Sequence, residues 1–135
     1  LLSIGFDKVF YLQRRDRIAQ AFSFTKALAT DQWMSHQKPK REVPSRAITN
    51  SLILYALYSF SKWEEYYRMH VASHVDRTYV YEDVVEDPSI VQSVFRECGL
   101  ERPEIDGLSS SIKVQHTDED ADRIEQFRKY LMGAE

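Results

Sequence analysis

Residues 14–23 combine positive charge with a hydroxyl in a pattern suited to binding a phosphate. Arg14, Arg15 and Arg17 follow an apolar run and stand where a helix is expected to begin. A helix N-terminus offers free N–H groups and a positive dipole, and a guanidinium can hold phosphate oxygens in a fork. Ser23 follows Arg15 by eight residues, about two helical turns, so we expect both on one face. Taken alone, the segment fits an exposed basic helix start better than a phosphate site.

A second group of candidate residues stands where another short strand is expected to end. Tyr81 can offer an aromatic face and a hydroxyl to a nucleobase, and Glu82 and Asp83 can accept hydrogen bonds from nearby N–H groups. A core tyrosine followed by acidic turn residues explains the same pattern. Further along, Lys113 and Gln115 could reach a phosphate or adenine, although a capped helix start is the simpler interpretation.

Other chemistries have little support in the sequence. His70 and His74 stand four residues apart, as two metal ligands on a helix can, but no cysteine pair accompanies them. We expect a solvated helix face there and predict no metal site. Cys98 cannot form an internal disulfide, since it is the single cysteine, and we expect it to be a small core residue.

The elements that must position these residues alternate between strand and helix. Apolar runs rich in β-formers predict a short buried strand over residues 8–13 and another over 77–81. Helical spacing predicts helices over 17–34, 48–75, 88–99 and 118–131, with loops over 35–45 and 102–111 and an acidic turn over 82–87. Asp16 is expected to cap the first helix, and Gly99 to end the third. The pattern indicates an α/β domain that is mostly helical, with a small parallel sheet.

Taken together, the first two groups carry a resemblance to a known family. Residues 10–23, with a strand, Arg15-Asp16 and then Ser23, resemble the motif with which sulfotransferases bind the 3′-phosphate of 3′-phosphoadenylyl sulfate (PAPS). The variant Arg-Arg-Asp-Arg-Ile-Ala-Gln-Ala-Phe-Ser is most similar to the bacterial trehalose 2-sulfotransferase family. Residues 80–88, Val-Tyr-Glu-Asp-Val-Val-Glu-Asp-Pro, resemble the Tyr-Glu-Asp segment of sulfotransferases. The resemblance extends from about residue 8 to the end of the chain.

This resemblance implies a function and a set of binding residues. It implies a partial P-loop-type sulfotransferase fold that uses PAPS, or its product PAP, to sulfate a carbohydrate or glycolipid hydroxyl. Arg15 and Ser23 would hold the 3′-phosphate and Tyr81 would lie beside the adenosine. The weaker candidates for the same site are Arg14, Arg17, Gln20 and Gln115.

One part of the family pattern has no counterpart in this sequence. The N-terminal phosphosulfate loop, rich in Ser, Gly and Thr, is missing, and the catalytic base carried near it is missing too, so no catalytic residue is assigned. The chain starts with Leu1 and an apolar run, without methionine. We therefore expect residues 1–135 to form a single, incomplete sulfotransferase-like domain that supplies the 3′-phosphate and adenosine half of the cofactor site.

Composition limits the remaining partners and locations. The net charge of −3 provides no global attraction for nucleic acid, no apolar run approaches the length of a membrane span, and a lone cysteine suits the cytoplasm. The aromatic stripe of the 48–75 helix, Tyr55, Tyr58, Trp63, Tyr66 and Tyr67, is expected to be core or interface, and a homodimer could use it. Two alternatives stay open: a non-catalytic helical interaction protein or degenerate remnant of the fold, and a different nucleotide-binding module that prefers ATP.

Overall fold

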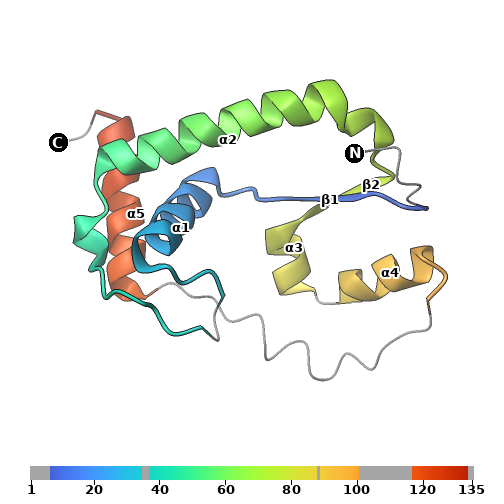
Figure 1. Cartoon of the computed structure of the whole chain (residues 1–135), viewed down its shortest axis with the longest axis horizontal. Coiled ribbons are helices and arrows are strands. Elements are labelled where there is room, and N and C mark those ends of the chain that lie inside the picture. The colour runs from blue at the N-terminus through green and yellow to red at the C-terminus, as the bar shows by residue number, and fades with distance from the viewer. Residues whose placement is uncertain (1–6, 35–36, 88, 101–116, 134–135) are drawn as a thin grey trace. The chain divides into compact units, whose positions relative to one another are not determined.

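The computed structural model describes residues 7–34, 37–87, 89–100 and 117–133, and helices predominate in it (Figure 1). Strands β1 and β2 form a parallel pair, which confirms the predicted α/β class with a small parallel sheet. The elements in chain order are β1 (Phe10–Gln13), α1 (Arg17–Thr30), the 3₁₀ turn η1 (Ser45–Ala47), α2 (Asn50–His70), the 3₁₀ turn η2 (Ala72–His74), β2 (Arg77–Val80), α3 (Tyr81–Glu86), α4 (Ser89–Glu97) and α5 (Asp118–Leu131).

The chain divides into two compact units, which are described separately. The strand unit holds the described residues of Leu1–Arg15 and Tyr66–Lys113. The helical unit holds the described residues of Asp16–Glu65 and Val114–Glu135. The boundary between them falls between Arg15 and Asp16, inside the predicted phosphate-binding motif.

In the strand unit, β1 and β2 run parallel and in register. Phe10 lies opposite Arg77, and Gln13 lies opposite Val80. The prediction that the first strand is buried is wrong, because Leu12 is 57% exposed and the rest of β1 is at best half-buried. Among the described residues β1 has a strand neighbour on one edge only, and a two-stranded sheet offers little surface to bury against.

The start of the strand pair is fixed by an aspartate. Asp76, just before β2, accepts hydrogen bonds from the Val9 N–H at 2.8 Å and from the Lys8 ammonium at 3.2 Å. These bonds, the backbone one first, hold the pKa of Asp76 below its ordinary value. A carboxylate that is charged at neutral pH therefore joins two segments far apart in sequence.

The segment after β2 differs from the expected acidic turn. Tyr81–Glu86 forms the short helix α3. Glu82 and Asp83 lie in its first turn, where free N–H groups and the helix dipole favour carboxylates. The acidic residues therefore stabilise a helix start that was expected to be a turn.

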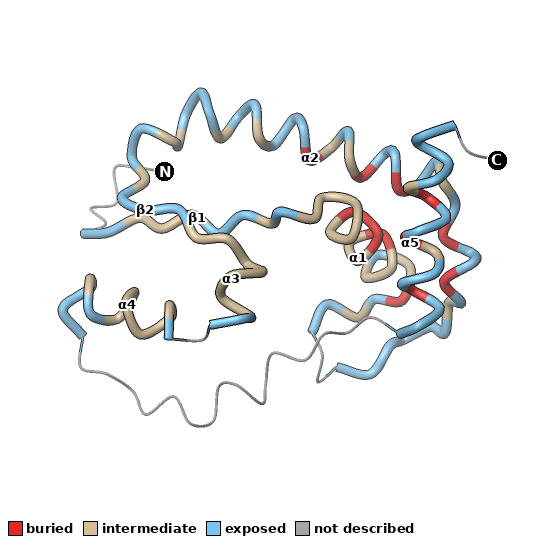
Figure 2. Tube along the Cα trace, turned by 180° about the vertical axis from the view of Figure 1, so that it is seen from behind, coloured by how far each residue is buried: buried red, intermediate tan, exposed pale blue. Residues whose placement is uncertain are grey.

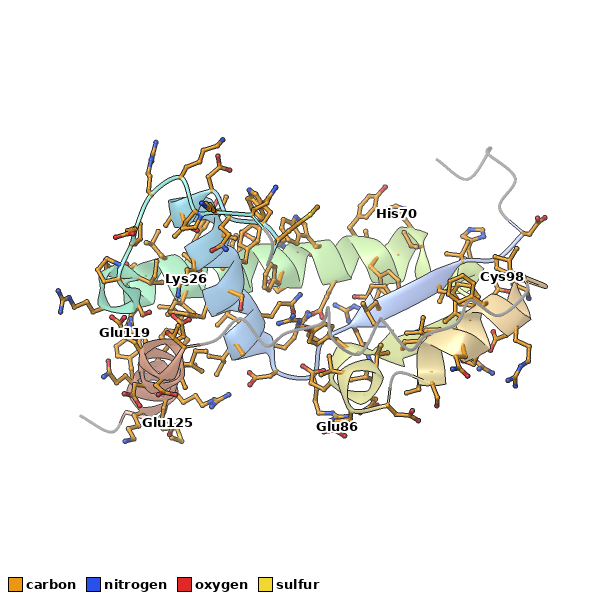
Figure 3. The ribbon with its side chains drawn as sticks, turned by 90° about the horizontal axis from the view of Figure 1, so that it is seen from below. Lys26, His70, Glu86, Cys98, Glu119 and Glu125 are labelled. Carbon is orange, nitrogen blue, oxygen red and sulfur yellow. The ribbon has the colours of Figure 1, made fainter. Side chains whose placement is uncertain are left out.

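Helix α4 ends as its sequence predicts. Gly99 follows it with a φ of 66°, the left-handed conformation that glycine adopts most easily. The other end of this helix was predicted at Pro88, which lies outside the described residues. The expectation that Cys98 is a core residue is wrong: its side chain is exposed, because α4 is only partly covered (Figure 3).

In the helical unit, α1 begins at its predicted cap and ends early. The Asp16 carboxylate accepts a hydrogen bond from the Ala19 N–H at 3.0 Å, which confirms the predicted N-cap. The helix ends at Thr30 and not at Met34, because Asp31 adopts a left-handed conformation with a φ of 56°. The Asp31 carboxylate there accepts from Lys40 and Trp33, which stabilise the turn.

The core of the helical unit lies where α1, α5 and the first half of α2 pack together (Figure 2). Phe22 and Phe127 are fully buried, and burying a side chain of that size contributes about 1.5–3 kcal/mol. The core residues are Ala21, Phe22, Ile48, Ile53, Ala56, Phe60, Ile124 and Phe127. This packing fixes α1, which carries several of the candidate residues.

Helix α5 begins and ends as predicted. Thr117 caps it with a capping box: the Thr117 hydroxyl accepts from the Asp120 N–H at 3.3 Å, and the Asp120 carboxylate accepts from the Thr117 N–H at 3.0 Å. The preceding loop, predicted over residues 102–111, lies outside the described residues.

Asp120 also joins three elements of the helical unit. Its buried carboxylate accepts two hydrogen bonds from Lys26 of α1, at 2.6 and 2.8 Å, and one from the Ser45 hydroxyl of η1. Figure 3 shows Lys26 extending from α1 toward α5. Burial acts to raise the pKa of Asp120, but these bonds and the one from the Thr117 N–H outweigh it and lower that pKa below its ordinary value.

Helix α2 is shorter than the predicted 48–75 and keeps much of its aromatic stripe exposed. Tyr55, Tyr58, Trp63 and Tyr66 are exposed, so the prediction that the stripe is core is wrong for them. The buried apolar residues of α2 that belong to the core lie on another side of the helix. In the described part of the chain, no helix combines the length and the apolar character needed to cross a membrane. Whether the stripe is an interface stays a prediction.

Candidate functional site

The strand register brings two of the predicted binding segments together within the strand unit. Gln13, the last residue of β1, lies opposite Val80, the last residue of β2. Arg14 and Arg15 leave the end of one strand, and Tyr81 begins the helix at the end of the other. The carboxyl ends of parallel strands are where α/β proteins bind ligands.

Arg15 is held at this edge by the first turn of α3. Its Nη2 donates to the Asp83 Oδ1 at 2.6 Å, and its backbone N–H donates to the Glu82 Oε2 at 2.9 Å. The hydrogen bond and charge of Asp83, together with the charges of Glu82 and Glu86, raise the pKa of Arg15 above its ordinary value. Arg15 therefore keeps a full positive charge at an exposed position.

Arg14 and Tyr81 form a second contact at the same edge. The Arg14 guanidinium carbon lies 3.9 Å from the centre of the Tyr81 ring, a cation–π distance. Both side chains are half-buried. A guanidinium and an aromatic ring in contact form the kind of platform on which a purine base stacks.

The other described candidates lie on α1 in the helical unit. Arg17 forms an ion pair with Glu64 of α2 and donates from Nη1 to the Gln20 Oε1 at 3.0 Å. Ser23 lies one turn further along α1 and is half-buried. Because Arg15 precedes the cap residue and lies outside α1, helical phase does not relate it to Ser23. That part of the sequence argument is wrong, while the roles of both residues stay predictions.

The remaining features do not add to this group. Gln115 lies outside the described residues. A cavity of about 460 Å³ in the helical unit is lined by Lys26, Thr30, Gln32, Pro39, Arg41, Glu42, Val43 and Pro44, none of them a predicted site residue. In the described part of the chain, no cluster of three or more His, Cys, Asp or Glu side chains is arranged to hold a metal ion.

Sequence reasoning missed the acidic partners of the arginines. Asp83 and Glu82 lie 68 and 67 positions from Arg15, so local spacing could not pair them. The available signal was the parallel arrangement itself, which places residues after one strand beside residues after the other. For Glu64, the partner of Arg17, the sequence held no comparable signal, because Glu64 lies within a helix and does not follow a strand.

Comparison with known protein families assigns the chain to one of them. The Stf0 sulphotransferase family matches residues 2–130, nearly the whole chain. The chain belongs to the Stf0 sulphotransferase family, and its small parallel sheet with predominant helices is consistent with part of an α/β sulfotransferase fold. This confirms the resemblance to sulfotransferases that the two motifs indicated. Searches of the curated proteins and of the solved structures found no match.

Proposed function

We propose that this chain supplies the 3′-phosphate and adenosine half of the PAPS site of a sulfotransferase. The observation that carries the proposal is the exposed, charged Arg15, which follows β1 and pairs with Asp83 in the first turn of α3, the helix that Tyr81 begins at the carboxyl end of β2. Family membership supports sulfuryl transfer as the general chemistry. PAPS would supply the sulfuryl group, and PAP would remain bound at the same residues afterwards.

The side chains present fit the half of the nucleotide that is assigned to them. In the described part of the chain, only Nη2 of the Arg15 guanidinium is engaged, which leaves Nη1 and Nε as donors for phosphate oxygens. Tyr81, with Arg14 against its ring, provides the aromatic surface for adenine. Ser23 is proposed as a second donor to the phosphate, and Arg17, Gln20 and Gln115 as weaker contributors.

No residue of this chain is assigned to the chemical step. Sulfuryl transfer requires neutralised charge on the moving group and a base for the acceptor hydroxyl. The phosphosulfate loop and the base have no counterpart in the sequence, so the role proposed for residues 1–135 is to bind and orient the nucleotide. We propose a carbohydrate or glycolipid hydroxyl as the acceptor, by similarity to the trehalose 2-sulfotransferase variant of the motif.

Two further proposals concern assembly and location. The exposed tyrosines Tyr55 and Tyr58 of α2 support a homodimer through that helix, since large exposed aromatic side chains commonly mark interfaces. The single cysteine supports a cytoplasmic location, because secreted proteins of this size more often contain disulfides.

Replacement of Arg15 tests the binding proposal, with Arg77 as a matched control. Both are exposed arginines of the strand unit paired to one carboxylate, but Arg77 stands at the opposite end of β2 and pairs with Glu97. Calorimetric titration with 3′,5′-ADP should show at least about tenfold weaker binding for Arg15→Ala, because a charged hydrogen bond to the phosphate is lost. Arg77→Ala should stay within about twofold of the unmodified chain. Equal losses in the two variants, or an unchanged affinity in Arg15→Ala, would contradict the proposal.

A further inference from the structure

Arg15 is paired with a carboxylate at the place where a phosphate is proposed to bind. Asp83 accepts from its Nη2 at 2.6 Å, and Glu82 accepts from its backbone N–H. Each carboxylate carries the same sign of charge as the phosphate, so each opposes anion binding at this edge. We propose that Asp83 is an internal competitor for the anion that Arg15 binds. The inference rests on the proposed function, since it concerns the regulation of the same site.

The Arg15–Asp83 pair is suited to being exchanged. The two side chains are 64% and 45% exposed, so water and salt screen their attraction. A phosphate carries up to two negative charges and offers several acceptor oxygens to the guanidinium, whereas Asp83 offers the one oxygen that Arg15 contacts. Before the anion binds, Asp83 keeps Arg15 in place. The incoming anion can then replace Asp83 or share the guanidinium with it.

Glu82 has a different function at the same edge. It accepts from the backbone N–H of Arg15, and so ties the end of β1 to the start of α3. The competition is therefore assigned to Asp83, which accepts from the guanidinium itself, and not to both acidic residues in the first turn of α3. A weakly held guanidinium surrounded by negative charge should discriminate against small anions that form no other contact, such as inorganic phosphate.

The substitution Asp83→Asn isolates the charge of this competitor. Asparagine keeps an acceptor oxygen in the same place but removes the negative charge. The matched control is Glu97→Gln, which removes one negative charge from another arginine pair of the strand unit, that with Arg77 at the far end of β2. Both variants change the net charge of −3 by the same amount, so a general electrostatic effect would act equally on both.

The experiment measures anion binding to the whole chain, with inorganic phosphate and 3′,5′-ADP as the probes. Binding is followed by the NMR signal of the Arg15 Nε–H, at about 20 mM and about 500 mM salt. We expect Asp83→Asn to bind both probes roughly three- to tenfold more tightly at low salt, from the removal of a like charge a few ångströms away. At high salt the gain should fall to roughly twofold or less, since the Debye length shrinks. Glu97→Gln should bind both as the unmodified chain does.

The outcomes separate this inference from the proposed function. Tighter phosphate binding in Asp83→Asn alone supports the inference, even if the chain fails to prefer 3′,5′-ADP to 5′-AMP and the proposed function is lost. In a second outcome, binding of 3′,5′-ADP depends on Arg15 but is no tighter in Asp83→Asn than in the unmodified chain. That result overturns the inference and leaves the proposed function standing. An equal gain in Asp83→Asn and Glu97→Gln, or a gain that is insensitive to salt, overturns the inference as well.

Discussion

The Asp120 network makes a quantitative prediction about the stability of the helical unit. Replacement of Asp120 by Asn keeps the size and one acceptor oxygen of the side chain but removes its charge. Lys26, whose side chain is only 27% exposed, would then face a neutral group, and the hydrogen bonds from Ser45 and the Thr117 N–H would weaken. The variant should therefore unfold more easily, although its surface is almost unchanged.

The expected loss follows from the burial of the two partners. Removing one partner of a fully buried ion pair costs about 3–5 kcal/mol, because the other charge stays uncompensated. Here Asp120 is fully buried, but Lys26 can partly reach water, so we expect a loss of about 2–3 kcal/mol in the free energy of unfolding. For a chain of this length that corresponds to roughly 6–12 °C in the melting temperature.

Thermal and urea unfolding followed by circular dichroism measure this loss, with Asp122→Asn as the matched control. Asp122 is an exposed residue of the same helix, so its replacement removes the same charge and should change the stability by less than about 0.5 kcal/mol. A second variant, Lys26→Met combined with Asp120→Asn, should recover part of the loss, since it no longer leaves the lysine charge unpaired.

The pH dependence provides a further check on the same network. Because the pKa of Asp120 is lowered in the folded chain, its contribution is fully present above the unfolded pKa of about 3.9 and is lost as the pH falls through the lower folded value. The stability difference between the unmodified chain and Asp120→Asn should thus shrink below about pH 4. If Asp120→Asn unfolds like Asp122→Asn at pH 7, the network does not stabilise the unit and the reasoning is refuted.

Two other predictions concern the start of α1 and the exposed face of α2. Asp16→Ala should lower the free energy of unfolding by about 1–2 kcal/mol in urea titrations, because the N-cap bond and the pair with Arg128 are both lost. Asp16→Asn should lower it less, because asparagine keeps the cap; equal losses in the two variants would contradict this. A homodimer through α2 predicts that light scattering yields about twice the chain mass of 15.9 kDa, and that Tyr55→Glu with Tyr58→Glu yields the monomer while Tyr130→Glu does not. A monomer in the unmodified chain would exclude that dimer.

The features that the sequence predicted well depend on short stretches of chain. Asp16 caps α1 through the N–H of Ala19, three residues away, and α5 has its bounds because Thr117 and Asp120 cap it within one turn. The left-handed Gly99 after α4 is likewise a local property. Such features follow from residue types and spacing alone.

The features that the sequence could not predict depend on distant partners. Arg15 lies 68 positions from Asp83, and only the pairing of β1 with β2 brings them together. Tyr55 is exposed although its neighbours in the helix are apolar, because α1 and α5 cover a different side of α2. Asp31 ends α1 early through a turn in which Lys40 takes part. Tertiary contacts of this kind override local preference.

For the candidate site, the structure shows which of the predicted residues lie near one another, and their binding roles stay predictions. The candidates Arg14, Arg15 and Tyr81 were drawn from two segments, and the strand register places both segments at one edge of the strand unit. The pairing of Arg15 with Ser23 rested on a helical phase that does not include Arg15, because Asp16 is the N-cap. The joint role of Arg15 and Ser23 in binding a phosphate therefore stays a prediction.

A calorimetric titration of this chain with 3′,5′-ADP, with 5′-AMP and ATP as controls, tests whether the chain carries a 3′-phosphate half-site. We predict measurable binding of 3′,5′-ADP, with 5′-AMP at least about tenfold weaker because it lacks the 3′-phosphate that Arg15 is proposed to hold. Equal affinity for 3′,5′-ADP and 5′-AMP, a preference for ATP, or no binding of any of the three would contradict the assignment of the 3′-phosphate half-site to this chain.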